Sequence, residues 1–142
     1  MSPVVRDDRL VGIHRVFLDA EGNKLDKMML GDCRGGAVRL FGSGPRLIVG
    51  EGVETTIALK LASAAIEGAF WSAMSASGMA NLQLPATAGE LIVAPDGDKA
   101  GRDAAEALAQ RAMRAGWKVS TLPAPEGKDW NDLLLEESCC AD

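Results

Sequence analysis

An apolar run that ends in two closely spaced carboxylates is the strongest constraint in this sequence. Residues 91–94 are apolar throughout, which is typical of a strand buried on both faces of a parallel sheet. Asp96-Gly97-Asp98 follows, and residues 99–115 have the periodicity of an amphipathic helix. In open α/β sheets, ligands bind at the carboxyl ends of the strands. The stretch therefore predicts a charged site at the end of a central strand.

Asp96 and Asp98 have two interpretations. Like charges so close together repel each other, and a divalent cation held by oxygen ligands relieves that repulsion. Alternatively, the Asp-Gly pair forms a turn and the second aspartate caps the helix that follows. The stretch alone leaves both interpretations open.

The rest of the chain alternates between strand and helix patterns after residue 45. Strands are expected at 46–50, 69–76, 91–94 and 117–122, and helices at 54–66, 79–84 and 99–115. This alternation predicts an α/β fold with a mainly parallel sheet of about four strands, flanked by helices. Three further strands, at 11–18, 24–30 and 37–41, are expected to form a small β layer before it.

A glycine- and proline-rich segment, Gly42-Ser43-Gly44-Pro45, marks the expected boundary between these two parts. The prediction is an N-terminal β-rich subdomain over residues 1–44, a catalytic domain over 45–136 and a tail over 137–142. Residues 1–9 are polar, and we expect them to be frayed.

Composition excludes several classes of site. The chain has one histidine and three cysteines without a Cys-x-x-Cys pair, so no zinc site is expected, and His14 is expected to face solvent from its strand. No apolar run approaches the length of a membrane helix and no signal peptide pattern is present, so the expected location is cytoplasmic. Residues 1–50 hold eight Lys or Arg against six acids, and residues 51–142 hold seven against fourteen. Without a strong basic patch, tight duplex binding by this chain alone is not expected.

Carboxylates are expected at the ends of three strands. Glu51 follows the first strand of the parallel sheet, and Asp96 and Asp98 follow the third. Asp129 and Asp132 come after the fourth strand, so they can approach the same edge. Several carboxylates at one edge suit one or two Mg²⁺ or Mn²⁺ ions. The sequence has no P-loop, and a lone histidine makes a Ser-His-Asp triad implausible.

Basic side chains near these acids have two interpretations as well. Lys99 and Arg102 follow the Asp pair and either meet a phosphate or are exposed residues of the first helical turn. A second group lies in the N-terminal part and forms either a weak basic face or an ordinary solvated surface: Arg15, Lys24, Lys27, Arg34 and Arg39.

Three motifs in order resemble the Toprim domain. These are Gly50-Glu51-Gly52, Asp96-Gly97-Asp98-Lys99-Ala100-Gly101 and Gly127-Lys128-Asp129, each placed after an expected strand. The fuller Glu51-Gly52-Val53-Glu54-Thr55 and Lys128-Asp129-Trp130-Asn131-Asp132 segments are most similar to phage- and plasmid-type primases related to the bacterial replicative primase. The resemblance covers roughly residues 11–135 and implies a Toprim, Rossmann-like fold.

The resemblance also implies roles for individual residues. Glu51 is implied as acid, base or metal ligand, Asp96 and Asp98 as catalytic ligands of Mg²⁺ or Mn²⁺, and Asp129 as an outer ligand. Contacts to nucleic acid or nucleotide are expected from Lys99, Arg102, Lys128, Lys27 and Arg39. Such primases have a second aspartate two positions after the one that matches Asp129, where this chain has Asn131.

The function expected from the resemblance is magnesium-dependent nucleotidyl transfer that makes an RNA primer on a single-stranded DNA template from nucleoside triphosphates. A metal-dependent nuclease and a non-catalytic module that binds DNA or protein are the alternatives. The family resemblance implies that a zinc-binding domain or a helicase is supplied by a longer chain or a partner.

Overall fold

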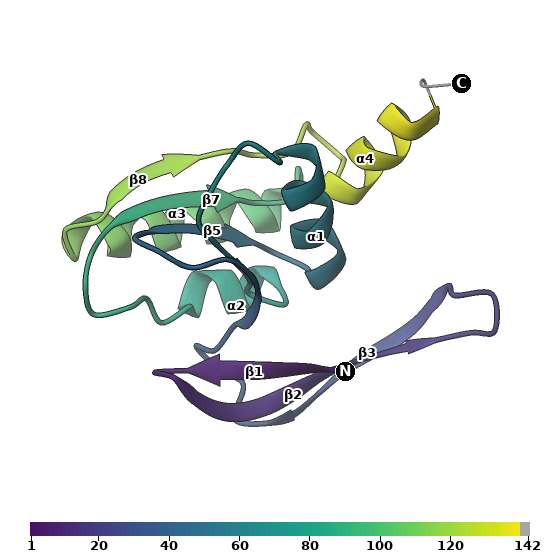
Figure 1. Ribbon diagram of the computed structural model, residues 1–142, viewed down its shortest axis with the longest axis horizontal. Helices are drawn as coiled ribbons and strands as arrows, with labels where there is room; N and C mark the ends of the chain where they lie inside the picture. Colours follow the sequence, from purple (N-terminus) through teal and green to yellow (C-terminus); the bar gives the residue numbers. More distant parts are fainter. Residues whose placement is uncertain (140–142) are drawn as a thin grey trace.

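The computed structural model describes residues 1–139, with side chains to residue 136. Its strands form two separate sheets (Figure 1). An antiparallel sheet in the order β1-β2-β3 contains Ser2–Arg6, Arg9–Leu18 and Lys24–Gly31. Residues 140–142, half of the predicted tail, lie outside the described residues.

The central sheet has five strands in the order β4-β6-β5-β7-β8. These strands are, in chain order, β4 Val38–Phe41, β5 Arg46–Gly50, β6 Ala69–Ser72, β7 Glu90–Ala94 and β8 Lys118–Thr121. β5 pairs in parallel with both β6 and β7, and β7 pairs in parallel with β8. The predicted mainly parallel α/β sheet is therefore confirmed.

β4 is placed differently from the prediction. It pairs antiparallel with β6, so it is an edge strand of the central sheet and not part of the N-terminal β layer. The central sheet thus has five strands where about four were expected. The local pattern of residues 37–41 predicts a strand but carries no information about its partner, because pairing is settled by long-range packing.

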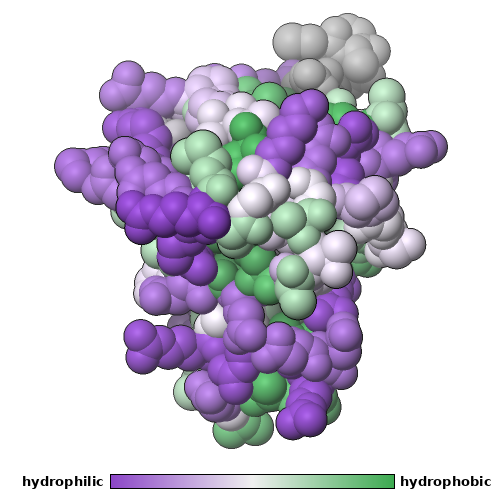
Figure 2. Space-filling view, turned by 90° about the vertical axis from the view of Figure 1, so that its left-hand side faces the viewer, coloured by the Kyte–Doolittle hydropathy of each residue, from purple (hydrophilic) through white to green (hydrophobic). Residues whose placement is uncertain are grey.

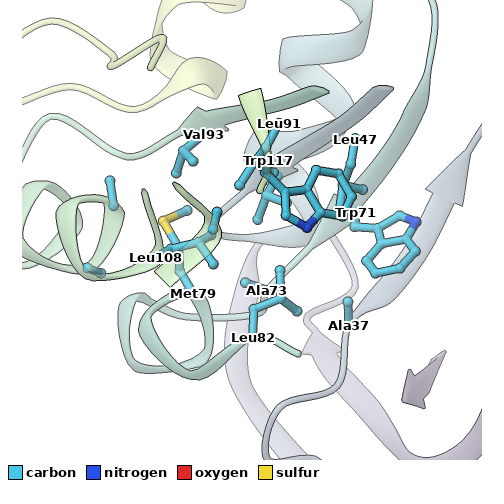
Figure 3. Close-up of a cluster of buried hydrophobic side chains, with 14 of the residues drawn as sticks. Ala37, Leu47, Trp71, Ala73, Met79, Leu82, Leu91, Val93, Leu108 and Trp117 are labelled. Carbon is cyan, nitrogen blue, oxygen red and sulfur yellow. The ribbon is translucent and has the colours of Figure 1, made fainter. Parts of the chain in front are cut away.

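Helices cover both faces of the central sheet. α2 Ala76–Asn81 and α3 Lys99–Arg114 pack on one face, where Met79 and Leu108 belong to the same buried cluster as Leu47 and Leu91 of the sheet (Figure 3). α1 Val53–Ala62 and α4 Trp130–Cys139 lie on the other.

Alternating side chains of β5 supply both of these cores. Leu47 and Val49 enter the cluster under α2 and α3, whereas Ile48 enters the cluster that contains Leu59 of α1 and Trp130 of α4. This is why residues 47–49 form a continuous apolar run: the part of a strand that is covered on both faces has no polar side.

Two elements, the strand β6 and the helix α1, end earlier than expected. The strand predicted over 69–76 stops at Ser72, because Ser75 takes the N-cap position of α2 and its Oγ accepts a hydrogen bond from the amide of Gly78 at 3.0 Å. α1 ends at Ala62 instead of residue 66, with Ser63 as its C-cap.

Two predictions about the N-terminal sheet are wrong. Ser2–Arg6 is an ordered strand and not a frayed end, because Val4 is fully buried and the main chains of Val5 and Ala37 exchange hydrogen bonds. His14 is 3% exposed and not solvent-facing. It lies on the face of β2 that packs toward the central domain, and period-2 alternation in a short strand does not reveal which face is covered.

Figure 1 shows the parallel strands running toward the side where α1 and α4 lie, and the β2–β3 hairpin reaches the same side. Figure 2 views the opposite side, where hydrophilic side chains surround a strip of hydrophobic ones. Within residues 1–139, no helix has both the length and the apolar character needed to cross a membrane.

Candidate functional site

Glu51 and Asp96 lie side by side at the carboxyl edge of the central sheet. They follow β5 and β7, two adjacent parallel strands whose last residues, Gly50 and Ala94, are register partners. The charge of Glu51 therefore acts on Asp96, and the charge of Asp98 acts on both. The structure thus brings together the first three acids that the sequence singles out.

Burial and crowding raise the pKa of two carboxyl groups at this edge. The pKa of Asp96 is raised to about 7, first by burial and then by the charges of Glu51, Asp129, Asp98 and Asp132. The pKa of Glu51 is raised as well, by burial and by Asp98, and hydrogen bonds from the amides of Ala76 and Asp96 oppose that shift. Asp129 and Asp132 thus reach the edge, as predicted.

Two glycines allow this convergence. The amide of Gly97 donates to the carbonyl of Lys128 at 2.8 Å, and a Cβ at Gly97 would lie 1.8 Å from the carbonyl oxygen of Pro125. A Cβ at Gly101 would lie 3.1 Å from Oε2 of Glu51. The first glycine lets the loop that precedes Asp129 approach, and the second lets α3 begin against Glu51.

The helix-cap interpretation of the Asp pair is confirmed for Asp98, and the metal interpretation stays a prediction. Its Oδ1 accepts a hydrogen bond from the amide of Gly101 at 2.7 Å, so it caps α3 as well as adding charge to the edge. Asp129 has a comparable double role, because it and Asp132 each accept a hydrogen bond from the other's amide, at 2.8 and 2.9 Å, where α4 begins. Asp96 is not the N-cap residue of α1, α2 or α3.

The acids open onto a hollow of about 650 Å³, which we call the acid pocket. Glu51, Asp96 and Asp129 line one side, and Lys24 and Lys27 of β3 line another. Lys27 also donates to the carbonyl of Met74 at 3.4 Å, which holds the hairpin over the pocket. The pocket therefore places cationic side chains opposite a concentrated set of carboxylates.

Three other basic residues predicted for the site do not line the acid pocket, and each contacts another group. Lys99 pairs with Asp103, and Arg102 donates to the carbonyl of Gly97 at 3.0 Å. Lys128 pairs with Glu136 at 2.6 Å.

Arg39 lies apart from the acid pocket. Its guanidinium pairs with Asp8 at 2.6 Å and lies 4.5 Å from the ring centre of Trp71. It lines a separate hollow of about 280 Å³ with Asp7 and Gln83. The structure therefore does not group Arg39 with the other predicted site residues.

Ser72 and Met74 also lie at the site, and no specific sequence pattern predicts their roles. Ser72 is fully buried, and its Oγ donates to the carbonyl of Glu51 and accepts from the amide of Met74, both at 3.1 Å. Met74 has a φ of 70°, a left-handed conformation that is unusual for a residue with a side chain. The segment Ser72-Ala73-Met74, a serine followed by two nonpolar residues, is just as typical of an ordinary strand end as of a functional site.

The donor set at the edge fits a divalent cation. Oε2 of Glu51 and Oδ1 of Asp96 are buried and have no hydrogen-bond partner among the described residues. Unpaired buried carboxylate oxygens are costly, and a bound cation would satisfy both. Within the described part, no three His, Cys, Asp or Glu side chains already converge into a metal cluster. Mg²⁺ uses only one or two carboxylates and keeps several waters, so two suffice.

Comparison with solved structures shows a shared fold with bacterial primases. The RNA polymerase domain of Mycobacterium tuberculosis primase DnaG is 20% identical with a TM-score of 0.60, and the match covers 98% of this chain and 51% of that one. The Aquifex aeolicus primase, with zinc-binding and RNA polymerase domains, is 20% identical with a TM-score of 0.57, over 90% and 34%. A DNA primase domain from Pseudomonas aeruginosa is 19% identical with a TM-score of 0.50, over 96% and 53%.

This chain spans between about a third and about half of the length of those structures. Comparison with curated proteins gives no match. The family model of the Toprim domain matches residues 46–139, which is more than half of the chain and includes Glu51, Asp96, Asp98 and Asp129. This match covers the parallel strands and the carboxylates at their ends, and it shows that this chain belongs to the Toprim domain family.

Proposed function

We propose that this chain is the nucleotidyl-transfer module of a primase-like protein in DNA replication. The observation that carries the proposal is the pair of unpartnered, buried oxygens on Glu51 and Asp96, two residues that line a pocket with lysines on another side. The primase folds among the solved structures are consistent with this reaction class. The substrates we propose are nucleoside triphosphates and a single-stranded DNA template.

In this proposal, Asp96, Asp98 and Glu51 hold Mg²⁺ or Mn²⁺, and Asp129 orients the outer water shell. A cation bound there supplies charge that favours ionisation of a 3′-hydroxyl and offsets the negative charge of the phosphates. Glu51 is suited to accept a proton, because burial and Asp98 raise the pKa of its carboxyl.

Lys27 is proposed to contact phosphate from β3, on another side of the same pocket. Lys128, Lys99 and Arg102 are proposed as weaker contacts, because two of them are held in surface ion pairs and Arg102 is bonded to Gly97. Arg39 is not among the proposed nucleotide contacts, because it stacks on Trp71 away from the acid pocket. A zinc-binding domain or a helicase, in a longer chain or a partner, would supply template affinity in a cytoplasmic setting.

The first test is a calorimetric titration of the full chain with Mg²⁺ and with Mn²⁺, comparing wild type with Asp96→Asn. We expect binding to be lost in Asp96→Asn and retained in Asp103→Asn, an exposed aspartate on α3. Unchanged affinity in Asp96→Asn would remove the metal from this edge and end the proposal.

A second assay separates synthesis from cleavage. Labelled single-stranded DNA is incubated with Mg²⁺, with and without nucleoside triphosphates. Extension products that require the triphosphates support nucleotidyl transfer, and shortened DNA without them supports a nuclease. Metal binding with neither product would favour a non-catalytic binding module, in which Asp98 and Asp129 serve chiefly as helix caps.

A further inference from the structure

The sheet of β1, β2 and β3 has an inner face, which points toward the central domain, and an outer face, which points away from it. His14 is buried on the inner face, and Lys27 lines the acid pocket from the same face. Neighbouring residues of a strand point to opposite sides of a sheet, whereas register partners point to the same side. The alternate residues of β2 and β3 therefore form the outer face, and they are Ile13, Arg15, Phe17, Asp26, Met28 and Leu30.

The outer face is more apolar than its position predicts. In an antiparallel sheet with one covered face, the covered face is normally apolar and the solvated face polar. Here His14 and Lys27 lie on the covered face, whereas Phe17, Met28 and Leu30 on the outer face are 41%, 49% and 56% exposed. Figure 2 shows hydrophobic side chains at the lower end of the molecule, where Figure 1 places this sheet. A contiguous apolar patch of this kind is typical of a surface that another protein covers.

Two charged residues, Arg15 and Asp26, lie within this apolar face. The guanidinium of Arg15 lies 5.7 Å from the ring centre of Phe17. Nε of Arg15 is buried and has no hydrogen-bond partner among the described residues. The side chain of Asp26 is exposed, and its Oδ1 accepts a hydrogen bond from the amide of Lys27 at 2.7 Å. Since an unpaired buried donor is costly, the face carries a cation that lacks an acceptor and an exposed carboxylate that can supply one.

The register of β2 with β3 arranges these charges so that the face is complementary to itself. Arg15 lies opposite Met28, and Phe17 lies opposite Asp26, so the four side chains form a two-by-two block. Arg15 and Asp26 occupy one diagonal of this block, and Phe17 and Met28 occupy the other. A two-fold axis along the apolar diagonal, in the plane between two facing copies, exchanges the two charged positions. Arg15 of each copy then meets Asp26 of the other, and the apolar diagonals pack on each other.

We propose that the outer face binds the outer face of a second copy of this chain, which gives a two-fold symmetric dimer. Three strands about 4.8 Å apart and about eight residues long form a face of roughly 26 Å by 14 Å. Two such faces bury on the order of 1,000 Å², which is the size of weak and reversible interfaces. The self-complementary charges favour a second copy over any other occupant of the face. Both acid pockets stay open in this dimer, because Lys27 lines its pocket from the inner face.

The test is sedimentation equilibrium of the full chain from about 1 µM to about 1 mM, the range in which weak dimers dissociate. Arg15→Asp leaves two acids on the block, and Asp26→Arg leaves two bases. Each variant alone then places like charges against each other across the two-fold axis, so we expect its self-association to weaken at least about tenfold. In an equimolar mixture of the two variants, every charged contact joins an acid to a base. We therefore expect the mixture to associate about as tightly as wild type.

Two further variants separate the face from the overall charge. Arg114→Asp makes the same change of charge at an exposed position of α3, and it should leave association unchanged. Met28→Ser removes an exposed apolar side chain from the axis, and it should weaken association about tenfold. Circular dichroism verifies that each variant is folded, which we expect because the substituted side chains contribute to no buried cluster.

Two results would overturn the inference. One is a wild-type chain that stays monomeric up to about 1 mM, which would leave the outer face to a different occupant. The other is a dimer that either tolerates Arg15→Asp and Asp26→Arg separately or fails to reform when the two variants are mixed, because its contact would then use another surface. Since Mg²⁺ binding is measured separately, the outcome does not depend on the proposed function.

Discussion

The amide of Gly97 donates to the carbonyl of Lys128 at 2.8 Å, and this contact joins two loops that are about thirty residues apart in the chain. The amide of Gly127 returns a hydrogen bond to the carbonyl of Gly97 at 2.9 Å. This pairing holds Asp129 close enough to raise the pKa of Asp96. The carboxylate edge is thus assembled by main-chain contacts as much as by its acids.

The contact makes Gly97 sensitive to substitution. Gly97→Ala would place a Cβ 1.8 Å from the carbonyl oxygen of Pro125, so the two loops have to separate. We expect a loss of unfolding free energy of about 2–4 kcal/mol and weaker Mg²⁺ binding, because Asp129 moves away from Asp96. Urea denaturation and calorimetry measure the two effects. Glu126→Ala, an exposed position in the same loop, is the control and should change neither.

Asp96 predicts an unusual dependence of stability on pH. Because its folded pKa of about 7 lies above the ordinary value of 3.8, the folded state binds the proton more tightly, and stability falls as pH rises from about 4 to about 7. Without metal, Asp96→Asn should therefore be more stable than wild type at pH 8, by about 1–2 kcal/mol, since solvent screens a half-buried group. Denaturation at pH 5 and pH 8 measures the difference, which should be smaller at pH 5, where only part of the fall in stability has taken place. A constant difference at both values would contradict the assigned pKa.

His14 predicts the opposite trend in the same range. Burial lowers its pKa below 6.5, so the unfolded state binds the proton more tightly and stability is lost as pH falls below about 6.5. Glu54 opposes this shift, while Lys27 and Lys24 reinforce it. His14→Leu should remove the acid-side loss, seen as a smaller drop in melting temperature between pH 7 and pH 5. An unchanged drop in this variant would show that another group titrates.

Ser72 is expected to position Glu51 without taking part in the chemistry. Ser72→Ala leaves the amide of Met74 and the carbonyl of Glu51 without their shared partner in a fully buried place. The expected loss is about 1–3 kcal/mol of unfolding free energy, with a reduced Mg²⁺ affinity. Ser120→Ala, at an exposed position of β8, should leave both values unchanged. Destabilisation without any change in Mg²⁺ affinity would limit Ser72 to a structural role.

The strand ends were predictable from local pattern because a doubly covered strand must be apolar at every position. Residues 47–49 and 91–94 are apolar runs, and an acid follows each of them within two residues. Parallel pairing then places Glu51 and Asp96 at one edge, which the structure confirms through the partners Gly50 and Ala94. The order of motifs also predicted the Toprim domain correctly.

Only the tertiary structure decided the partners and the faces. The sequence determined that 37–41 is a strand and that residue 14 lies in one, but β4 joins the central sheet and His14 is buried. The sequence did not reveal the left-handed backbone conformation of Met74 or the contact between Gly97 and Lys128. Local periodicity follows from the geometry of one element, whereas strand pairing, burial of a given face and close approach of two loops depend on what the rest of the chain places beside them.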